Sequence, residues 1–217
     1  MLRGDGIMRK ALGVLVGLGA LATGAHAIGF LQLPGEGNTG ISGGAWIPGG
    51  SFDPDWITVS QPSSEPNLPR VVGAVAGWLP TSATSRWIGP GRSNGVAVSA
   101  AAGTYVYKIE IDMTGMSTVG YLEGRILADD VADVYLNGDR TTSWAHSTSA
   151  QDWTEFKIDK GWVLGQMNFL EVVVQNSTPS TTAFRVEFTE AEPVPEPATI
   201  AGLAAGLALL ARRRRRA

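Results

Sequence analysis

Asp129, Asp130 and Asp133 place three carboxylate side chains within one short run of the sequence. Carboxylate oxygens suit Ca²⁺, a hard cation that takes about six to eight oxygen ligands, so the run predicts a candidate calcium site. The run lacks the glycine-containing pattern of an EF-hand loop. The alternative is that the three acids lie in a solvated loop and bind no metal.

Seven tryptophans offer a second kind of chemistry, because an indole face can stack on the apolar face of a sugar ring. The competing role is core packing, where one large aromatic side chain buries about 150–250 Å². Trp153 and Trp162 lie in or beside strand-like sequence, which favours the core. Trp87, and Trp144 in a Ser/Thr-rich loop beside His146, are the predicted surface residues for glycan contact.

Catalytic arrangements find little support in the sequence. The chain has no cysteine and two histidines, so thiol catalysis and cysteine-based zinc sites are excluded. It has no G-x-S-x-G, H-E-x-x-H or phosphate-binding loop motif. Asp152, Glu155 and Asp159 could supply the carboxylate pair of a polysaccharide hydrolase, although acids on a strand surface usually face water. The sequence therefore predicts a protein without catalysis.

The elements that must position these residues are β-strands. In the run 105–112, Lys108, Glu110 and Asp112 share one face while the apolar residues share the other, which is the period of two of a half-buried strand. Asn137-Gly138 predicts a two-residue hairpin, since both residues tolerate positive φ. Further strands are predicted in the runs 45–47, 56–59, 71–75, 119–127, 133–136, 153–158, 168–175 and 183–188.

This pattern predicts an all-β domain in which two antiparallel sheets pack face to face. The runs 128–138, 161–172 and 182–188 resemble three strands typical of galactose-binding-like jelly-roll domains. The resemblance covers residues 70–190 and implies an antiparallel jelly-roll-like sandwich. Because such domains often hold a structural calcium ion, it also favours the calcium site predicted at the three aspartates. An immunoglobulin-like sandwich is the alternative fold.

The N-terminal residues have the organisation of a cleavable signal peptide. Met8-Arg9-Lys10 supplies a positive start, residues 11–21 an apolar run, and Ala25 and Ala27 an A-x-A cleavage site. Met8 is the better start of translation. Residues 28–197 hold nine Lys and Arg against 19 Asp and Glu, a net charge of −10. Such an acidic part argues against nucleic acid as a partner.

The C-terminal residues combine three features in a fixed order. Val194-Pro195-Glu196-Pro197 interrupts regular structure, residues 198–211 form an uncharged apolar run, and Arg212, Arg213, Arg214, Arg215 and Arg216 follow. The order resembles the PEP-CTERM sorting signal of exported bacterial proteins, which implies processing by an exosortase near the Pro-Glu-Pro motif. As a helix the apolar run would be about 21 Å long, against a hydrocarbon core of about 30 Å. A short transmembrane helix that inserts transiently suits this length better than a permanent anchor.

Together these features predict six segments. They are a signal peptide (1–27), Gly/Pro-rich strands and loops (28–69), a β-sandwich (70–190), a linker with the sorting motif (191–197), a short transmembrane helix (198–211) and an Arg-rich cytoplasmic tail (212–217). The predicted partners are signal peptidase and exosortase during export, and exopolysaccharide at the cell surface or in the extracellular matrix. The predicted role is structural or adhesive, and a lectin-like module is the alternative.

Overall fold

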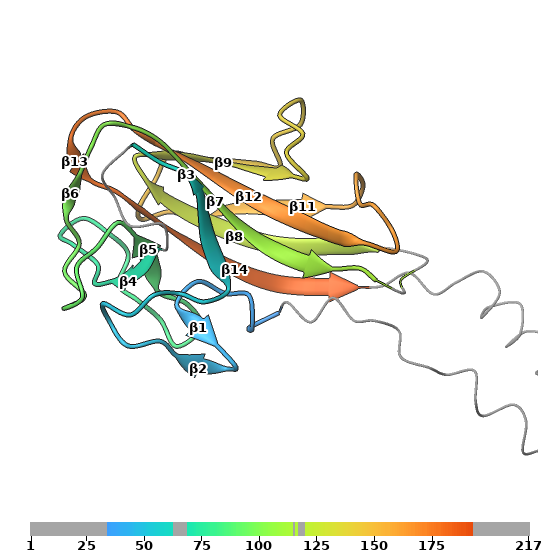
Figure 1. The fold of residues 1–217 in the computed structure, drawn as a ribbon, viewed down its shortest axis with the longest axis horizontal. Helices are drawn as coiled ribbons and strands as arrows, with labels where there is room; N and C mark the ends of the chain where they lie inside the picture. Colours follow the sequence, from blue (N-terminus) through green and yellow to red (C-terminus); the bar gives the residue numbers. More distant parts are fainter. Residues whose placement is uncertain (1–33, 63–68, 115, 117–119, 193–217) are drawn as a thin grey trace, which may run out of the picture.

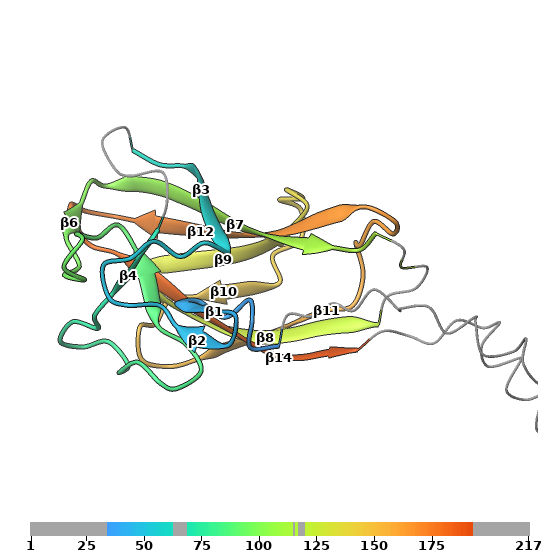
Figure 2. The same cartoon turned by 60° about the horizontal axis from the view of Figure 1, so that its bottom comes forward.

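The computed structural model describes residues 34–62, 69–114, 116 and 120–192. Every regular element in these ranges is a β-strand, and two five-stranded antiparallel sheets pack face to face (Figures 1 and 2). The prediction of an all-β antiparallel sandwich is therefore confirmed. Among the described residues there is no helix long and apolar enough to cross a membrane.

The first sheet, called the β12 sheet, has the order β10–β9–β12–β7–β3. Its central pair is β12 with β7, which runs in unbroken register from Met167 opposite Asp112 to Asn176 opposite Gly103. Its strands are β3 (Trp56–Ser60), β7 (Gly103–Asp112), β9 (Val131–Leu136), β10 (Ala145–Ser147) and β12 (Met167–Asn176).

The second sheet, called the β14 sheet, has the order β11–β8–β14–β5–β4. Its strands are β4 (Arg70–Val72), β5 (Trp87–Gly89), β8 (Tyr121–Asp129), β11 (Thr154–Ile158) and β14 (Ala183–Glu192). Two short pairs complete the fold, β1 (Ile41–Ser42) with β2 (Ala45–Trp46) and β6 (Ser99–Ala100) with β13 (Ser180–Thr181).

The long strands alternate between the two sheets along the chain. β7 belongs to the β12 sheet, β8 to the β14 sheet, β9 to the first again, and β11, β12 and β14 continue the alternation. An immunoglobulin sandwich instead places several consecutive strands next to each other in one sheet. The connectivity thus agrees with the jelly-roll-like prediction and not with the immunoglobulin alternative.

The main core lies between the sheets and is built from the inward-facing residues of both. The predicted alternation of β7 is confirmed, since Tyr105, Tyr107, Ile109 and Ile111 are buried and the residues between them are more exposed. Phe184 of β14 lies at the centre of an aromatic group, with its ring centroid 5.2 Å from Trp56 and 4.7 Å from Tyr107. This apolar core takes the place of disulfides in a chain without cysteine.

A second, smaller core covers the outer face of the β14 sheet. Leu127 and Ala183 point outward from this sheet and pack with Val72, Trp78 and Trp87. The segment that joins β4 to β5 supplies Trp78 and lies over the group. The β14 sheet is therefore covered on both faces where this segment crosses it.

Two sequence-based boundaries differ from the structure. Asn137 and Gly138 do adopt positive φ (52° and 72°), and the Asp139 N–H donates to the Leu136 carbonyl oxygen at 3.0 Å. The predicted two-residue hairpin is nevertheless wrong, because β9 pairs with β10 and the whole run 137–144 connects them. β14 also extends to Glu192, two residues beyond the expected domain end. The signal peptide, the apolar run 198–211 and the arginine block lie outside the described residues.

Neighbouring residues approach the β8 backbone closely at Gly124. A Cβ at this position would overlap Phe156 Cζ and lie 2.8 Å from the Glu187 carbonyl oxygen. We expect Gly124→Ala to lower the free energy of unfolding by about 1–3 kcal/mol, because overpacking forces side chains and backbone to move. Urea unfolding of the full-length chain measures the effect.

Gly73→Ala is the matched control, because its added Cβ would meet nothing closer than the Gly95 carbonyl oxygen at 3.8 Å. We expect this control to change the free energy of unfolding by less than about 0.5 kcal/mol. Equal effects of the two substitutions would contradict the packing described for β8.

Candidate functional site

Asp129 and Asp130 make separate contacts at the junction of β8 and β9. Asp129 Oδ2 accepts a hydrogen bond from Trp78 Nε1 at 2.7 Å, and Asp130 Oδ2 accepts one from the Ser177 backbone N–H at 2.8 Å. Burial, followed by the neighbouring Asp130, raises the pKa of Asp129. Both carboxylates thus tie loops to the ends of these strands.

Asp133 lies further along β9, beside the edge strand β10. Its Oδ1 is 2.9 Å from His146 Nδ1, and Ser143 Oγ donates to it at 3.1 Å. In the part of the chain that the structure describes, no three His, Asp or Glu side chains are grouped so as to hold a metal ion. A calcium ion bound by Asp129, Asp130 and Asp133 together stays a prediction that this arrangement does not support.

The predicted glycan contact at Trp87 is wrong, because this side chain is fully buried in the smaller core. Its ring centroid lies 4.5 Å from that of Trp78, and its Nε1 donates to the Leu79 carbonyl oxygen at 2.8 Å. The segment that carries Leu79 covers the ring, so no face of the indole is left for a sugar. Ser85, Gly89 and Pro90 lie near Trp87 in the sequence, but Trp87 begins the buried strand β5.

Trp144 remains a candidate for glycan contact, with a side chain that is only partly exposed. It is half-buried against the main core, its backbone N–H donates to the Val134 carbonyl oxygen at 2.9 Å, and Lys160 Nζ lies 6.0 Å from its ring centroid. Trp153 and Trp162 are half-buried and pack against the smaller and the main core respectively, as the sequence predicted.

The three acids considered for hydrolysis are exposed to solvent. Glu155 stands on β11 with its Cα opposite that of Arg125, and Asp152 accepts a hydrogen bond from Ser149 Oγ at 3.3 Å. Asp152, Glu155 and Asp159 do not line the groove described next. Their placement agrees with the interpretation of these residues as solvated surface acids.

A groove of about 400 Å³ runs along β3 and β7 on the outer side of the β12 sheet. Three of its lining residues are acids, and its one cation, Lys108, is 3.0 Å from Glu110. Partial burial, and then the charge of Glu36, raises the pKa of Asp55. The groove is lined by Glu36, Gly37, Pro54, Asp55, Ile57, Lys108, Ile109 and Glu110, so it offers no aromatic ring on which a sugar could stack.

Trp46 is the aromatic side chain that best fits a stacking role. Its side chain is 57% exposed, whereas Trp56, Trp78 and Trp87 are buried. The indole is held in place, because its Nε1 donates to the Ala83 carbonyl oxygen at 3.0 Å and Arg86 Cζ lies 5.3 Å from the ring. The sequence of the run 45–47 predicts only a short strand at Trp46. Its position between two pairs of glycines was the available signal for an exposed turn.

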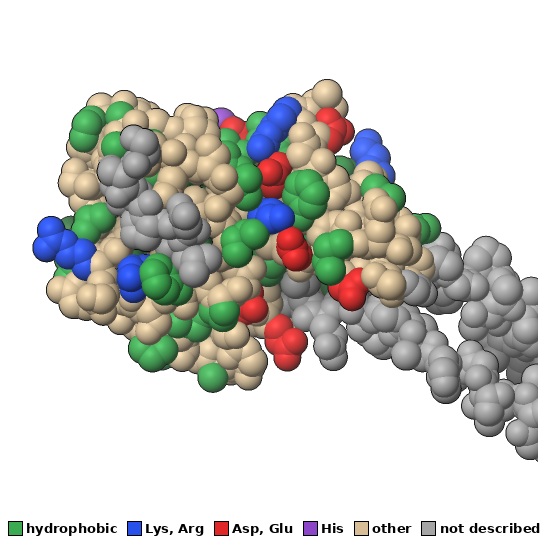
Figure 3. Space-filling view, in the orientation of Figure 1, with side chains coloured by type: hydrophobic (Ala, Val, Ile, Leu, Met, Phe, Trp, Pro, Cys, Tyr) green, Lys and Arg blue, Asp and Glu red, His purple; other side chains and the backbone are tan. Residues whose placement is uncertain are grey.

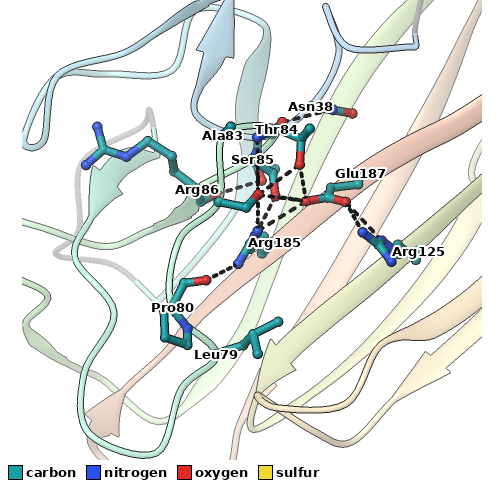
Figure 4. Close-up of polar contacts among 12 residues, drawn as sticks. Asn38, Leu79, Pro80, Ala83, Thr84, Ser85, Arg86, Arg125, Arg185 and Glu187 are labelled. Atoms are coloured by element: carbon teal, nitrogen blue, oxygen red, sulfur yellow. Dashed lines mark hydrogen bonds and ion pairs between the residues drawn. The ribbon is translucent and has the colours of Figure 1, made fainter.

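The segment 82–86, which holds Trp46, is itself fixed by a buried arginine on β14 (Figure 4). Arg185 is only 1% exposed. Its Nη1 donates to the Pro80 carbonyl oxygen at 2.7 Å, its Nη2 donates to Ser82 Oγ at 2.6 Å, and its Nε donates to Ser85 Oγ. A guanidinium has five N–H donors in a rigid plane, so it can hold several points of one segment at once.

Glu187, two residues further along β14, supplies the opposite charge. Its Oε1 lies 3.1 Å from Arg185 Nη2 and accepts hydrogen bonds from Ser85 Oγ at 2.6 Å and Thr84 Oγ1 at 2.7 Å. Its Oε2 accepts from Nε and Nη2 of Arg125 at 2.9 and 2.6 Å. Burial alone would raise the pKa of Glu187, but the hydroxyl and arginine hydrogen bonds outweigh it and lower the pKa to about 2.

The same segment is held on its other side by residues before β1. Asn38 Nδ2 donates to the Thr84 carbonyl oxygen at 2.9 Å. Thr39 and Arg86 are joined twice, since Thr39 Oγ1 donates to the Arg86 carbonyl oxygen at 2.7 Å and the Arg86 N–H donates to the Thr39 carbonyl oxygen at 2.8 Å. The backbone that presents Arg86 and accepts the Trp46 indole is thus fixed from both sides.

Comparison with known proteins identifies the C-terminal residues. Residues 193–216 match the model of the PEP-CTERM protein-sorting motif. The chain carries a PEP-CTERM sorting motif. This motif begins at the residue that follows β14, so the folded body leads directly into the sorting signal.

Two solved structures are similar to the chain at low sequence identity. A family 35 carbohydrate-binding module from an environmental isolate is 13% identical with a TM-score of 0.31, over 65% of this chain and 98% of that one. The epithelial adhesin 6 A domain from Candida glabrata is 12% identical with a TM-score of 0.27, over 55% of this chain and 57% of that one. Likeness at this level assigns no ligand. No curated protein matches the chain.

The buried charge group formed by Arg125, Arg185 and Glu187 leads to a prediction about stability. We expect Glu187→Gln to lower the free energy of unfolding at pH 7 by about 3–5 kcal/mol, because it leaves Arg185 buried without its carboxylate. The folded-state pKa of Glu187 is about 2 and its ordinary value is 4.5. Its contribution is therefore complete above about pH 4.5 and is lost as the pH falls toward 2. Urea unfolding at several pH values should show the gap between wild type and variant narrowing over this range.

Glu190→Gln is the control, since Glu190 is an exposed acid on the same strand. We expect it to change the free energy of unfolding by less than about 0.5 kcal/mol. A Glu187→Gln variant as stable as this control would show that the charge group does not hold the segment 82–86.

Proposed function

We propose that the protein is an exported, non-catalytic β-sandwich that acts as a structural or adhesive component of the cell surface or extracellular matrix. The observation that carries this proposal is the PEP-CTERM motif at residues 193–216, directly after the last strand of an all-β body. Its large apolar core lets a body that has no cysteine fold without disulfides after export.

The route that we propose uses both ends of the chain. Signal peptidase removes the leader after Ala27, and the apolar run 198–211 inserts transiently in the inner membrane with the arginines on the cytoplasmic side. An exosortase then cleaves near Pro195-Glu196-Pro197 and releases the folded body from its tail. The body would act outside the inner membrane, with exopolysaccharide as its proposed partner.

Intact-mass analysis of the protein recovered from its native cell surface tests this route. We expect an N-terminus at residue 28 and a C-terminus at or near the Pro-Glu-Pro motif. Replacing Pro195, Glu196 and Pro197 together with alanine should leave the tail attached and keep the protein in the membrane fraction. Mature surface protein that still carries Arg212–Arg216 would overturn the proposal.

Carbohydrate binding is a second candidate function, which the exposure of Trp46 favours. A fixed, exposed indole offers a stacking surface at little cost in conformational entropy, because its rotamer is already restrained by Ala83 and Arg86. Its neighbourhood also offers guanidinium N–H groups for the polar edge of a sugar. The role would be that of a lectin-like module and not of a hydrolase.

A glycan array probed with wild-type protein and Trp46→Ala tests this second function. We expect saturable binding that falls at least tenfold in Trp46→Ala, whereas Leu164→Ala, which truncates another exposed apolar side chain, leaves binding unchanged. Trp144→Ala shows whether the remaining tryptophan candidate contributes. Trp46→Phe keeps a ring and should retain part of the affinity. An array without any signal would favour a purely structural role.

A further inference from the structure

Two arginines converge on one turn beside Trp46. Arg86 Nη1 donates to the Ile47 carbonyl oxygen at 2.6 Å, and Arg70 Nη1 donates to the Gly50 carbonyl oxygen. Gly50 lies within a tight turn over residues 48–51, which is closed by a hydrogen bond from the Ser51 N–H to the Pro48 carbonyl oxygen at 3.1 Å, and Ile47 directly precedes this turn. Both guanidiniums are thereby positioned on the same small part of the surface.

A third arginine belongs to the loop that packs against this turn. Arg92 is exposed and begins a turn in which its carbonyl oxygen accepts the Gly95 N–H at 2.9 Å. The two turns are in direct contact, since a Cβ on Gly95 would lie 3.0 Å from the Gly49 carbonyl carbon and one on Gly50 would overlap the Ser93 carbonyl. We call Trp46, Phe52, Arg70, Arg86 and Arg92 the arginine–aromatic surface.

Ion pairs within the described part of the chain leave the positive charge of this surface unneutralised. Among the described residues, the ion pairs use other cations, and none of them includes Arg70, Arg86 or Arg92. The cations used are Lys108, Arg125, Arg140, Lys157 and Arg185. In Figure 3 the Lys and Arg side chains at the left end lie beside hydrophobic ones, while the acidic side chains on this face lie toward the middle.

The aromatic rings of the surface are paired with its arginines. Arg70 Cζ lies 3.7 Å from the Phe52 ring centroid, and Arg86 Cζ lies 5.3 Å from that of Trp46. Phe52 is 39% exposed and Trp46 is 57% exposed, so both rings remain accessible beside the guanidiniums. Arg70 and Arg86 are half-buried, and each uses Nη1 on a carbonyl oxygen at this turn, which leaves the N–H donors of Nη2. The planar geometry of a guanidinium matches a carboxylate or a phosphate.

We propose that the arginine–aromatic surface binds an anionic polysaccharide. A sugar ring stacks on Trp46, and Arg70 and Arg86 hold the acidic groups of the chain, with Arg92 adding positive charge. This inference rests on the carbohydrate-binding function proposed above and specifies its ligand class.

The overall charge of the body does not oppose such a ligand at this place. The described residues carry nine Lys and Arg against 17 Asp and Glu. At physiological salt, however, exposed charges further away than about 8 Å are largely screened. The acid nearest to Phe52 in the sequence, Asp53, is fully buried, and its carboxylate accepts the N–H groups of Gly40 and Asp55 at 2.7 and 3.1 Å. Burial raises the pKa of Asp53 to about 6, so this acid is also partly protonated in mildly acidic surroundings.

The test compares three polymers of similar length: alginate, which carries a carboxylate on every sugar, dextran, which is neutral, and poly-glutamate, which has carboxylates but no sugar ring. Binding to the full-length chain is measured at 150 mM NaCl, which is about physiological ionic strength. Arg212–Arg216 are replaced with glutamine in every protein so that the tail contributes no charge. We expect alginate to bind at least tenfold more tightly than either other polymer.

The variants separate charge from stacking. We expect the double variant Arg70→Gln/Arg86→Gln to lose at least tenfold in alginate affinity. Arg140→Gln is the matched control, because it removes an arginine that lies over another aromatic ring, Tyr135, and it should change affinity less than twofold. Trp46→Ala should weaken alginate binding at least fivefold and leave weak poly-glutamate binding unchanged. If the double variant does not fold, Arg70→Gln alone carries the comparison.

Several results would overturn the inference. Alginate affinity that is unchanged in a folded arginine variant excludes this surface, and poly-glutamate bound as tightly as alginate reduces it to a general polyanion site. Trp46-dependent dextran binding as tight as alginate binding would support carbohydrate binding but exclude a preference for anionic polysaccharides. Binding to none of the polymers would also exclude an anionic polysaccharide as the ligand. The proposed role at the cell surface is tested separately by the intact mass of the mature protein.

Discussion

The buried pair of Arg185 and Glu187 is the interaction on which the accessible surface depends. A charged pair in such a position is costly to desolvate and is strongly destabilising when one partner is removed, so every donor and acceptor around it must be placed correctly. Here the partners are hydroxyls and a carbonyl of the segment 80–85 together with Arg125 on β8. The pair therefore converts a connection between two short strands into a fixed part of the sandwich.

This fixed segment links the core to the molecule's most exposed tryptophan. The Ala83 carbonyl oxygen lies between residues whose hydroxyls bind the buried pair, and it accepts the indole N–H of Trp46. Arg86 follows directly and lies against the same ring. A change at Glu187 would thus reach Trp46 through the backbone. We therefore expect the proposed ligand binding to depend on the stability of this segment.

The predictions from sequence succeeded where a local pattern sets the structure. The period of two in β7 and β12 gave the strands and the faces that they bury, because one side of each strand must leave water. They failed where the outcome depends on contacts beyond a residue's immediate neighbours in the sequence. Trp87 has surface-like neighbours in the sequence but is covered by Trp78, and Asn137-Gly138 forms its turn without making a two-residue hairpin, since β9 finds its partner only at β10.

The sequence by itself determined the destination signals and the class of fold. The sorting motif is contiguous, and strand alternation repeats every two residues, so neither needs a long-range contact to be recognised. Tertiary structure alone decided which tryptophan is exposed and where positive charge collects. Trp46, Arg70, Arg86 and Arg92 are spread over 47 residues of an acidic chain. They meet around one turn because glycine-rich loops pack against each other. The composition and net charge of the whole chain do not reveal this local grouping.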